Sequence, residues 1–225
     1  MSNKILVIGE SGTGKSTSMR NLDPKSTFII KVFDKPLPFR TKKGDYKRLV
    51  VIGLKREDGN LYISDNYDRV EKCIKYISES RPDIKTIIVD DFQYIMANEF
   101  MRRARETGFN KFTEIAQHAW DVIMTESTRD DLNIYFLSHS EQTPEGKAKA
   151  KTIGKMLDEK ITLEGLFTIV LHARIHDGKY IFSTQYTDQY LAKSPMGMLD
   201  PIMDNDLDLV NKKIDEYYNF ETIEE

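Results

Sequence analysis

The sequence lacks the features that would place it outside a reducing compartment or inside a membrane. Its 225 residues contain one cysteine, Cys73, so an internal disulfide framework is excluded. No apolar run approaches the roughly 20 residues of a membrane-spanning helix. A strand-like apolar run already occupies residues 5–8, which leaves no room for a signal peptide. We therefore expect a cytoplasmic protein that does not enter a membrane.

The chain also lacks an excess of positive charge. It has 33 Lys and Arg against 36 Asp and Glu, a formal net charge of −3, so any nucleic-acid contact must be local or made by an assembly. No internal repeat or linker divides it. The length and the 40% hydrophobic content suit one α/β domain over residues 1–225, with an acidic C-terminal helix and tail from about residue 200.

The apolar run at residues 5–8 leads into Gly-Glu-Ser-Gly-Thr-Gly-Lys-Ser at residues 9–16. This spacing is typical of a P-loop, in which a strand passes through a glycine-rich turn into a helix. The glycines let backbone N–H groups face oxyanions, and the helix start adds a partial positive charge. Lys15 supplies a cation for the β- and γ-phosphates, and the Ser16 hydroxyl is a ligand for Mg²⁺. The pattern predicts an ATP·Mg²⁺ site, with a chance glycine-rich turn as the alternative.

A second apolar strand, at residues 86–89, ends in Asp90 and Asp91. We expect this strand beside the P-loop strand, with the Asp90 carboxylate supporting Mg²⁺ near Ser16. Apolar runs that end in aspartate are common, so the upstream P-loop gives this one its significance. Asp91 has two open roles, because it either polarises the attacking water or caps the helix that follows.

Residues 133–137 predict another buried strand, which is followed by His139. In a doubly wound sheet the carboxyl ends of the strands border the ligand. His139 is therefore placed either to sense the γ-phosphate and orient water, or to make a structural hydrogen bond at the strand end.

Residues 141–155 predict a mobile basic loop without apolar periodicity. Its lysines are Lys147, Lys149, Lys151 and Lys155. They are candidates for contacts with nucleic-acid phosphates. The loop has no interleaved aromatic residues for base stacking, so we expect binding without sequence preference. A solvated loop with no ligand is the alternative.

Weaker patterns predict the remaining elements. A short helix after the P-loop should end near Asn21, and Asp65 should cap a helix with an apolar stripe. His118 is expected at the surface. Asp-Gly at residues 177–178 predicts an antiparallel hairpin appended to a parallel core.

Five stretches, at residues 9–17, 86–91, 163–167, 180–185 and 192–198, together resemble phage-encoded ATPases with a RecA core, a family of phage nucleotide-binding proteins. The resemblance covers nearly the whole chain and is most distinctive at Lys-Ser-Pro-Met-Gly-Met, residues 193–198. It implies an α/β, RecA-like P-loop NTPase fold with a mostly parallel central sheet flanked by helices. Some members of the family act in single-strand DNA annealing and recombination beside a single-strand-binding protein.

By position, the resemblance implies metal support at Asp90 and the following nucleotide-binding residues: Gly9, Glu10, Ser11, Gly12, Thr13, Gly14, Lys15, Ser16 and Thr17. It also suggests a homo-oligomeric ring or filament with nucleotide at the subunit interfaces. A cation supplied in trans would then complete the site, and the candidates are Arg174, Lys179 and Lys193.

One departure from the RecA pattern concerns turnover. RecA-type enzymes place a catalytic glutamate after the strand that follows the P-loop helix, whereas this chain has Asp34 and Lys35 there. Either Asp34 or Asp91 substitutes, or hydrolysis is slow.

The sequence thus favours an ATPase of phage DNA recombination, annealing or replication that engages single-stranded DNA as an oligomer in the bacterial host cytoplasm. A helicase loader or a packaging-type accessory ATPase is the alternative. A small-molecule phosphotransferase is a third, weaker hypothesis, because its arginine-bearing lid has only one candidate cluster, at residues 102–105.

Overall fold

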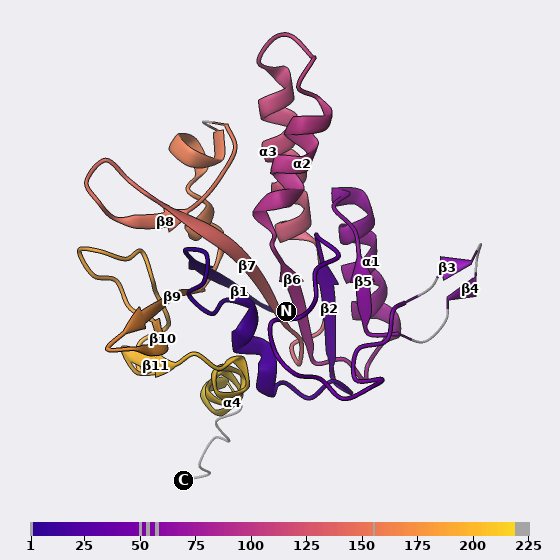
Figure 1. Cartoon of the computed structure of the whole chain (residues 1–225), viewed down its shortest axis with the longest axis vertical. Helices are drawn as coiled ribbons and strands as arrows, with labels where there is room; N and C mark the ends of the chain where they lie inside the picture. The colour runs from indigo at the N-terminus through magenta and orange to yellow at the C-terminus, as the bar shows by residue number, and fades with distance from the viewer. Residues whose placement is uncertain (1, 50, 53–54, 57–58, 155, 219–225) are drawn as a thin grey trace.

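The protein is described by a computed structural model that covers residues 2–49, 51–52, 55–56, 59–154 and 156–218. Within these residues, the main sheet has nine strands, in the order β11-β10-β9-β1-β7-β6-β2-β5, with β8 paired to β7 (Figure 1). The bounds are β1 Asn3–Gly9, β2 Thr27–Lys31, β5 Leu61–Ile63, β6 Thr86–Asp90, β7 Asn133–Gln142, β8 Ala148–Ala150, β9 Ile169–His176, β10 Lys179–Ser183 and β11 Ile202–Asp204. A separate two-stranded sheet pairs β3, Val51–Ile52, with β4, Lys55–Arg56.

The centre of the main sheet is parallel and its end is antiparallel. Strands β1, β7, β6, β2 and β5 pair parallel with one another in this order, and β9 pairs parallel to β1. The β9–β10 hairpin turns at Asp177 and Gly178, where positive φ angles of 49° and 74° fit a tight hairpin turn. The prediction of an antiparallel hairpin appended to a parallel core is therefore confirmed.

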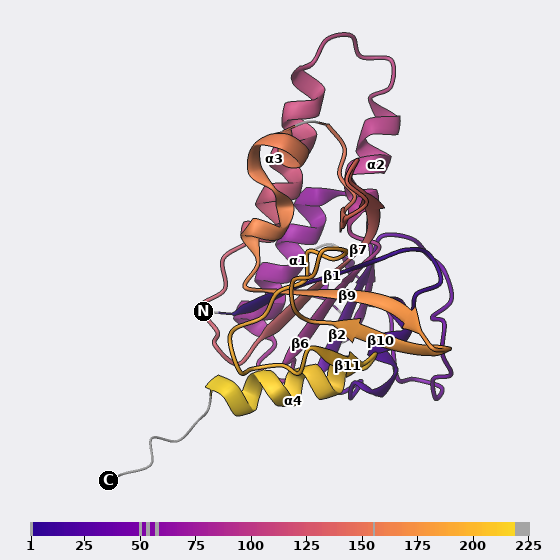
Figure 2. The ribbon, with the colours of Figure 1, turned by 90° about the vertical axis from the view of Figure 1, so that its left-hand side faces the viewer.

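Helices cover both faces of this sheet. Successive strand residues point to opposite sides, and both sides are apolar here, so each face packs against helices. On one face lie α1, α2 and α3, while η1 and α4 lie on the other, which Figure 2 shows for α4 at the lower edge. The bounds are η1 Ser16–Asn21, α1 Tyr67–Ser80, α2 Gln93–Arg102, α3 Asn110–Met124, η2 Met156–Ile161, η3 Leu163–Leu166 and α4 Leu207–Tyr218. Among the described residues, none of the helices has both the length and the apolar character needed to cross a bilayer.

The strand order corrects one expectation. The strand that ends in Asp90 was expected beside the P-loop strand, but β7 lies between them and pairs with both β1 and β6. The two strands have similar apolar patterns, and their pairing partners are chosen by long-range packing rather than by local sequence. The insertion of β7 brings His139 between the P-loop and Asp90.

The short helix predicted after the P-loop is confirmed, as a 3₁₀ helix that ends at Asn21. Local structure corrects three further expectations. The side chain that caps α1 belongs to Asn66, whose Oδ1 accepts from the Arg69 N–H at 3.0 Å. Asp65 instead accepts from Arg102. His118 is half-buried and stacks on Tyr67 with ring centroids 3.6 Å apart. Residues 141–152 are not an irregular loop, because β7 extends through Gln142 and pairs with β8.

Helix α4 docks on the sheet through a polar group as well as its apolar stripe. Leu207, Val210 and Ile214 are buried. Asn211 accepts from the Tyr135 hydroxyl at 2.6 Å and donates to Thr86 Oγ1 at 3.0 Å. Since Tyr135 is fully buried, this acceptor removes the penalty of an unpaired hydroxyl and fixes where α4 lies.

His172 on β9 is a buried imidazole beside the P-loop strand. It is 5% exposed, stacks on Tyr190 with centroids 4.4 Å apart, and neither ring nitrogen has a hydrogen-bond partner. Burial lowers its pKa to about 4, with a smaller contribution from Arg174. The native state therefore holds His172 neutral at pH values where the unfolded chain protonates it.

This difference predicts acid sensitivity. Because the folded-state pKa lies below the ordinary value of 6.5, stability should fall as the pH drops from about 6.5 to 4, by up to about 3 kcal/mol. Substituting His172→Phe keeps the aromatic contact and should flatten this part of the profile. Urea unfolding at several pH values measures the effect, with His176→Phe as the matched control on the exposed end of β9. Equal pH slopes for wild type and His172→Phe would contradict the prediction.

Candidate nucleotide-binding site

The site forms where four parallel strands end at the same edge of the sheet. The register pairs Gly9 of β1 with His139 of β7, and Lys31 of β2 with Asp90 of β6. The β7 residues that pair with β6 end at Phe136, so Ser138 and His139 lie just beyond this pairing, at the same edge as Asp90. The chain thereby gathers a glycine turn, an imidazole, a carboxylate and a lysine within one crevice, as expected for the carboxyl edge of a parallel sheet.

The glycine loop adopts a backbone that other residues strain to reach. Gly12 and Gly14 have φ angles of +83° and +90°. A Cβ at Gly14 would lie 2.9 Å from Tyr180 Cδ1 and 3.0 Å from Asn205 Oδ1, so the loop also packs tightly. Glycine is required here for both conformation and space.

Lys15 is held at the loop rather than in solvent. The residue is 8% exposed, and its Nζ donates to the carbonyls of Gly9 at 2.8 Å and Glu10 at 2.7 Å. Burial lowers its pKa to about 8, partly offset by Asp91 and Asp90. A triphosphate would supply the negative charge that favours the ammonium, so this lysine fits the phosphate-binding role.

Ser16 and Asp90 meet across the inserted strand. The Ser16 hydroxyl donates to Asp90 Oδ1 at 2.7 Å. Burial raises the Asp90 pKa to about 6, against the lowering effects of Ser16, Lys31 and Lys15. A hydroxyl and a carboxylate oxygen side by side are hard ligands that suit Mg²⁺, which in triphosphate sites uses few protein ligands beside phosphates and water. These two residues would hold the ion, which would neutralise charge on the phosphates.

The side chains of Asp91 and His139 face each other in the same cavity as Ser16 and Asp90. Asp91 has a positive φ of 65°, and its Oδ1 lies 3.8 Å from His139 Nε2, while its Oδ2 pairs with Lys35 Nζ at 3.1 Å. The His139 backbone N–H donates to Gln93 Oε1 at 3.0 Å. Burial lowers the His139 pKa, with Lys15 contributing in the same direction, so the ring is neutral near pH 7 and able to accept a proton or orient water.

These side chains line a cavity of about 280 Å³. Of the residues predicted for the site, it contains Ser11, Gly12, Gly14, Lys15, Ser16, Thr17, Asp90, Asp91 and His139. Glu10 and Ser11 border an adjoining cavity of about 490 Å³, which His139 and Lys151 also line. Gly9 and Thr13 form the loop behind, where the built Cβ of Gly9 would lie 2.6 Å from Thr13 Oγ1.

Sequence reasoning missed six residues that line this cavity: Lys31, Phe33, Lys35, Pro36, Pro38 and Tyr180. Lys31 ends β2 and reaches the cavity because β2 pairs with β6, a pairing that no local pattern in the sequence marks. Lys35 follows the same strand. Tyr180 comes from β10, which is far along the sequence, and no local pattern marks it.

Other candidates lie away from the cavity. Arg174 donates to Ser183 Oγ at 2.8 Å and lies over the Tyr190 ring at 5.2 Å. Asp34 pairs with Arg48. Neither Arg174, Lys179, Lys193 nor Asp34 lines the 280 Å³ cavity in the described part of the chain.

Three of the predicted nucleic-acid lysines, Lys147, Lys149 and Lys151, lie on or beside the β7–β8 hairpin. Lys149 is 3.6 Å from Glu141, and Lys147 donates to the Tyr186 hydroxyl at 2.6 Å. Lys151 is exposed, and its backbone N–H donates to the His139 carbonyl at 2.8 Å. Lys155 lies outside the described residues.

The glycine loop, the Lys15 ammonium and the Ser16–Asp90 pair on a mainly parallel sheet define a P-loop nucleoside triphosphatase fold and site. Residues 1–196 match a family model described as an AAA domain. The chain therefore belongs to this family of P-loop ATPases, and nucleotide hydrolysis is the activity that the family supports in general. No curated protein sequence matches the chain.

The crowding at Gly14 predicts a large effect of one added methyl group. Gly14→Ala should lower stability by about 2–4 kcal/mol, because a positive φ and a tight contact act together, and should weaken ATP binding. Gly108→Ala is the matched control, since Gly108 has a φ of +88° with open space around its Cβ. Urea unfolding and calorimetric titration with a non-hydrolysable ATP analogue measure both effects. Equal losses for the two variants would show that packing against Tyr180 and Asn205 contributes nothing.

The buried Asp90 carboxylate predicts opposite effects on stability and metal use. Its pKa of about 6 lies above the ordinary 3.8, so its destabilising effect appears as the pH rises from about 4 to 6 and is complete at pH 7.5. Asp90→Asn should therefore be more stable than wild type at pH 7.5 and similar at pH 4. Urea unfolding at the two pH values tests this, with the exposed Asp68→Asn as control.

The same variant should lose the extra thermal stabilisation that ATP gives with Mg²⁺ over ATP with a chelator. Full Mg²⁺-dependent stabilisation of Asp90→Asn would remove this carboxylate from the metal site.

Proposed function

We propose that this P-loop ATPase binds ATP with Mg²⁺ and couples it to single-stranded DNA in phage DNA recombination, annealing or replication. The nucleotide lies on the glycine loop, with Ser16 and Asp90 on the metal side. Asp91 positions the attacking water rather than Asp34, because Asp91 lines the cavity and Asp34 does not. Asp91 and His139 orient that water without a glutamate, which fits slow hydrolysis.

The observation that carries the DNA proposal is the continuity of β7. His139 borders the nucleotide, and the same strand continues into the hairpin that carries Lys149 and Lys151. The Lys151 N–H donates to the His139 carbonyl, so a shift of β7 at the nucleotide moves this backbone directly. Because γ-phosphate contacts can order or move adjoining segments, this hairpin is suited to report nucleotide binding to a DNA strand.

The same site supports the proposal of an oligomer. Within the described residues no arginine lines the 280 Å³ cavity, and its cationic side chains come from Lys15, Lys31 and Lys35. A ring or filament would allow a neighbouring copy to supply Arg174, Lys179 or Lys193. A single-strand-binding protein and the host cytoplasm belong to the same proposal through the phage-family resemblance.

The phosphotransferase hypothesis is weakened by the state of its arginines. Arg102 pairs with Asp65, and Arg103 pairs with Glu99, Glu106 and Glu114. These side chains neutralise acidic groups around α2 and do not line the nucleotide cavity.

ATPase activity with and without single-stranded DNA is the first test of this proposal. DNA should stimulate hydrolysis, and Lys15→Ala should reduce it by about a hundredfold or more, since it removes a cation from the transferring phosphate. Lys149→Ala/Lys151→Ala should lose the stimulation while keeping basal turnover. The matched control is Lys72→Ala/Lys75→Ala, which removes two exposed lysines from α1. Hydrolysis that ignores DNA would contradict the coupling and favour a helicase loader or packaging accessory.

A further inference from the structure

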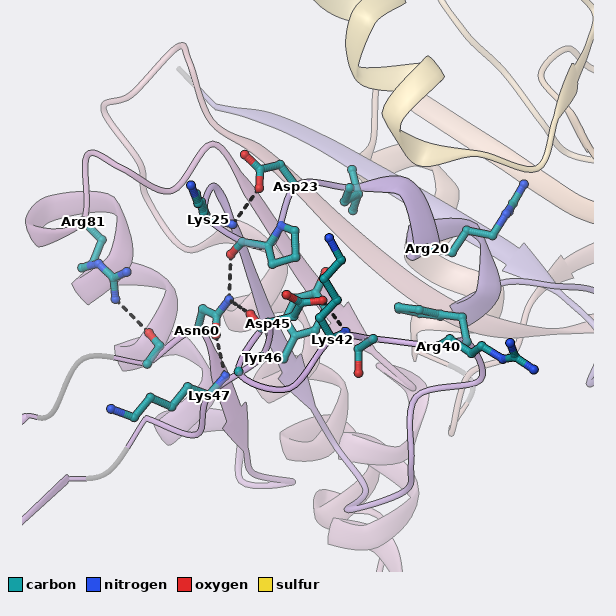
Figure 3. Close-up of a pocket in the computed structure, with 16 residues that line it drawn as sticks. Arg20, Asp23, Lys25, Arg40, Lys42, Asp45, Tyr46, Lys47, Asn60 and Arg81 are labelled. Atoms are coloured by element: carbon teal, nitrogen blue, oxygen red, sulfur yellow. Dashed lines mark hydrogen bonds between the residues drawn. The ribbon is translucent and has the colours of Figure 1, made fainter.

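A second cavity, larger than the nucleotide cavity, lies beyond the end of η1 and is named here the basic cavity. It has a volume of about 640 Å³. Figure 3 shows its walls, which come from three separate segments: residues 20–25, 39–47 and 59–60, with Arg81 at one side. Its size lies within the range of about 300–1,000 Å³ that ligand pockets occupy.

The lining of the basic cavity is strongly positive. Its cationic side chains are Arg20, Lys25, Arg40, Lys42, Lys47 and Arg81, and its carboxylates are Asp23 and Asp45. This local excess of four positive charges contrasts with the net charge of −3 of the whole chain. Positive charge concentrated in a concave surface attracts polyanions.

Partners within the protein neutralise only part of this charge in the described residues. Both carboxylates serve the local backbone, since Asp45 Oδ2 accepts from the Lys42 N–H at 2.7 Å and Asp23 Oδ1 from the Lys25 N–H at 3.0 Å. Arg81 pairs with Asp83, outside the cavity lining. In the portion of the chain that the structure describes, the three lysines of the cavity form no ion pair.

The walls are fixed by an asparagine that joins the three segments. Asn60 Nδ2 donates to the carbonyls of Pro24 at 2.7 Å and Asp45 at 2.9 Å, and its Oδ1 accepts from the Lys47 N–H at 2.8 Å. These dashed contacts appear at the centre of Figure 3. Gly59 beside it approaches the backbone so closely that a Cβ would lie 2.5 Å from Leu49 N. The cations therefore project from a preformed frame, which reduces the entropy lost on binding.

Two aromatic rings complete the lining. Phe39 and Tyr46 pack against the buried cluster under η1 and α4, and both also border the basic cavity. Aromatic surface beside a row of cations is the arrangement that binds single-stranded nucleic acid, because bases stack while phosphates meet the cations.

The basic cavity is also connected to the P-loop. Arg20 lies four residues after Ser16 on η1, and its Nη1 donates to the Thr17 carbonyl and the Asn205 carbonyl. A phosphate that competes for this guanidinium would act on the helix that begins at the nucleotide phosphates.

We propose that the basic cavity binds the phosphodiester backbone of single-stranded DNA, as a contact separate from the β7–β8 hairpin. The identity of the polymer rests on the proposed function, whereas the anion chemistry rests on the cavity alone. A continuous strand suits the lining better than one free phosphate, because the cations come from separate segments around about 640 Å³. Free nucleotide and inorganic phosphate share the same chemistry, and the experiment separates them from DNA.

Amine labelling of the wild-type protein gives the first test and needs no substitution. A labelled oligo(dT) strand, added without ATP, should protect Lys25, Lys42 and Lys47 from acetylation, as read by mass spectrometry. Lys72 and Lys75 on α1 should stay equally reactive. Inorganic phosphate at the same phosphate concentration should give no comparable protection. Protection by phosphate alone would make the cavity a small-anion site and overturn the proposal.

Strand binding by variants gives the second test. Lys42→Ala/Lys47→Ala should weaken oligo(dT) binding about 25-fold at 0.1 M salt and reduce the salt slope by about 1.4, since each phosphate contact in a single strand contributes about 0.7. Lys72→Ala/Lys75→Ala removes the same charge and should bind as wild type. ATP-analogue affinity should be unchanged in both, which confirms folding.

The outcomes separate this inference from the proposed function. Loss of binding only in Lys149→Ala/Lys151→Ala would overturn the basic cavity and leave the ATPase coupling intact. Protection of Lys42 and Lys47 with hydrolysis that ignores DNA would support the cavity and contradict the coupling. Failure of wild type to bind oligo(dT) would overturn both.

Discussion

The parallel hydrogen-bonding register of β1, β7, β6 and β2 is the constraint on which the rest of the structure depends. It fixes four strand ends at one edge, and so decides that Ser16 meets Asp90 and that His139 lies beside Asp91. A slip of one residue would turn every side chain to the other face and destroy both the core and the crevice. The same apolar alternation that buries the two helical layers therefore also builds the nucleotide site.

The C-terminal segment supports the P-loop from outside the stretch that matches the AAA domain. The matched residues end at 196, yet Asn205 packs on Gly14, and Asp206 Oδ2 accepts from Asn21 Nδ2 at 2.7 Å. Asn205 is 1% exposed, and its side-chain amide has no hydrogen-bond partner among the described residues. With α4 docked through Asn211, this segment packs η1 and the glycine loop against the rest of the fold.

In the basic cavity, different residues hold the backbone together and carry the positive charge. The frame residues, such as Asn60, form hydrogen bonds within the protein, whereas Lys42 and Lys47 extend from that frame without ion pairs in the described residues. The net charge of the chain conceals this arrangement, because acidic residues elsewhere outnumber the basic ones. The net charge excluded only a global basic surface, and folding assembles this local one from separate segments.

By itself the sequence determined the P-loop, the Asp90 strand and the Asp-Gly hairpin, because each depends on short-range backbone geometry and on contiguous residues. Tertiary structure alone decided that β7 separates β1 from β6, that residues 141–152 pair as a hairpin, and that Tyr180 and Lys31 line the nucleotide cavity. Those features depend on which distant strands pair and which faces pack, and such choices are made by the free energy of the whole core rather than by any local pattern.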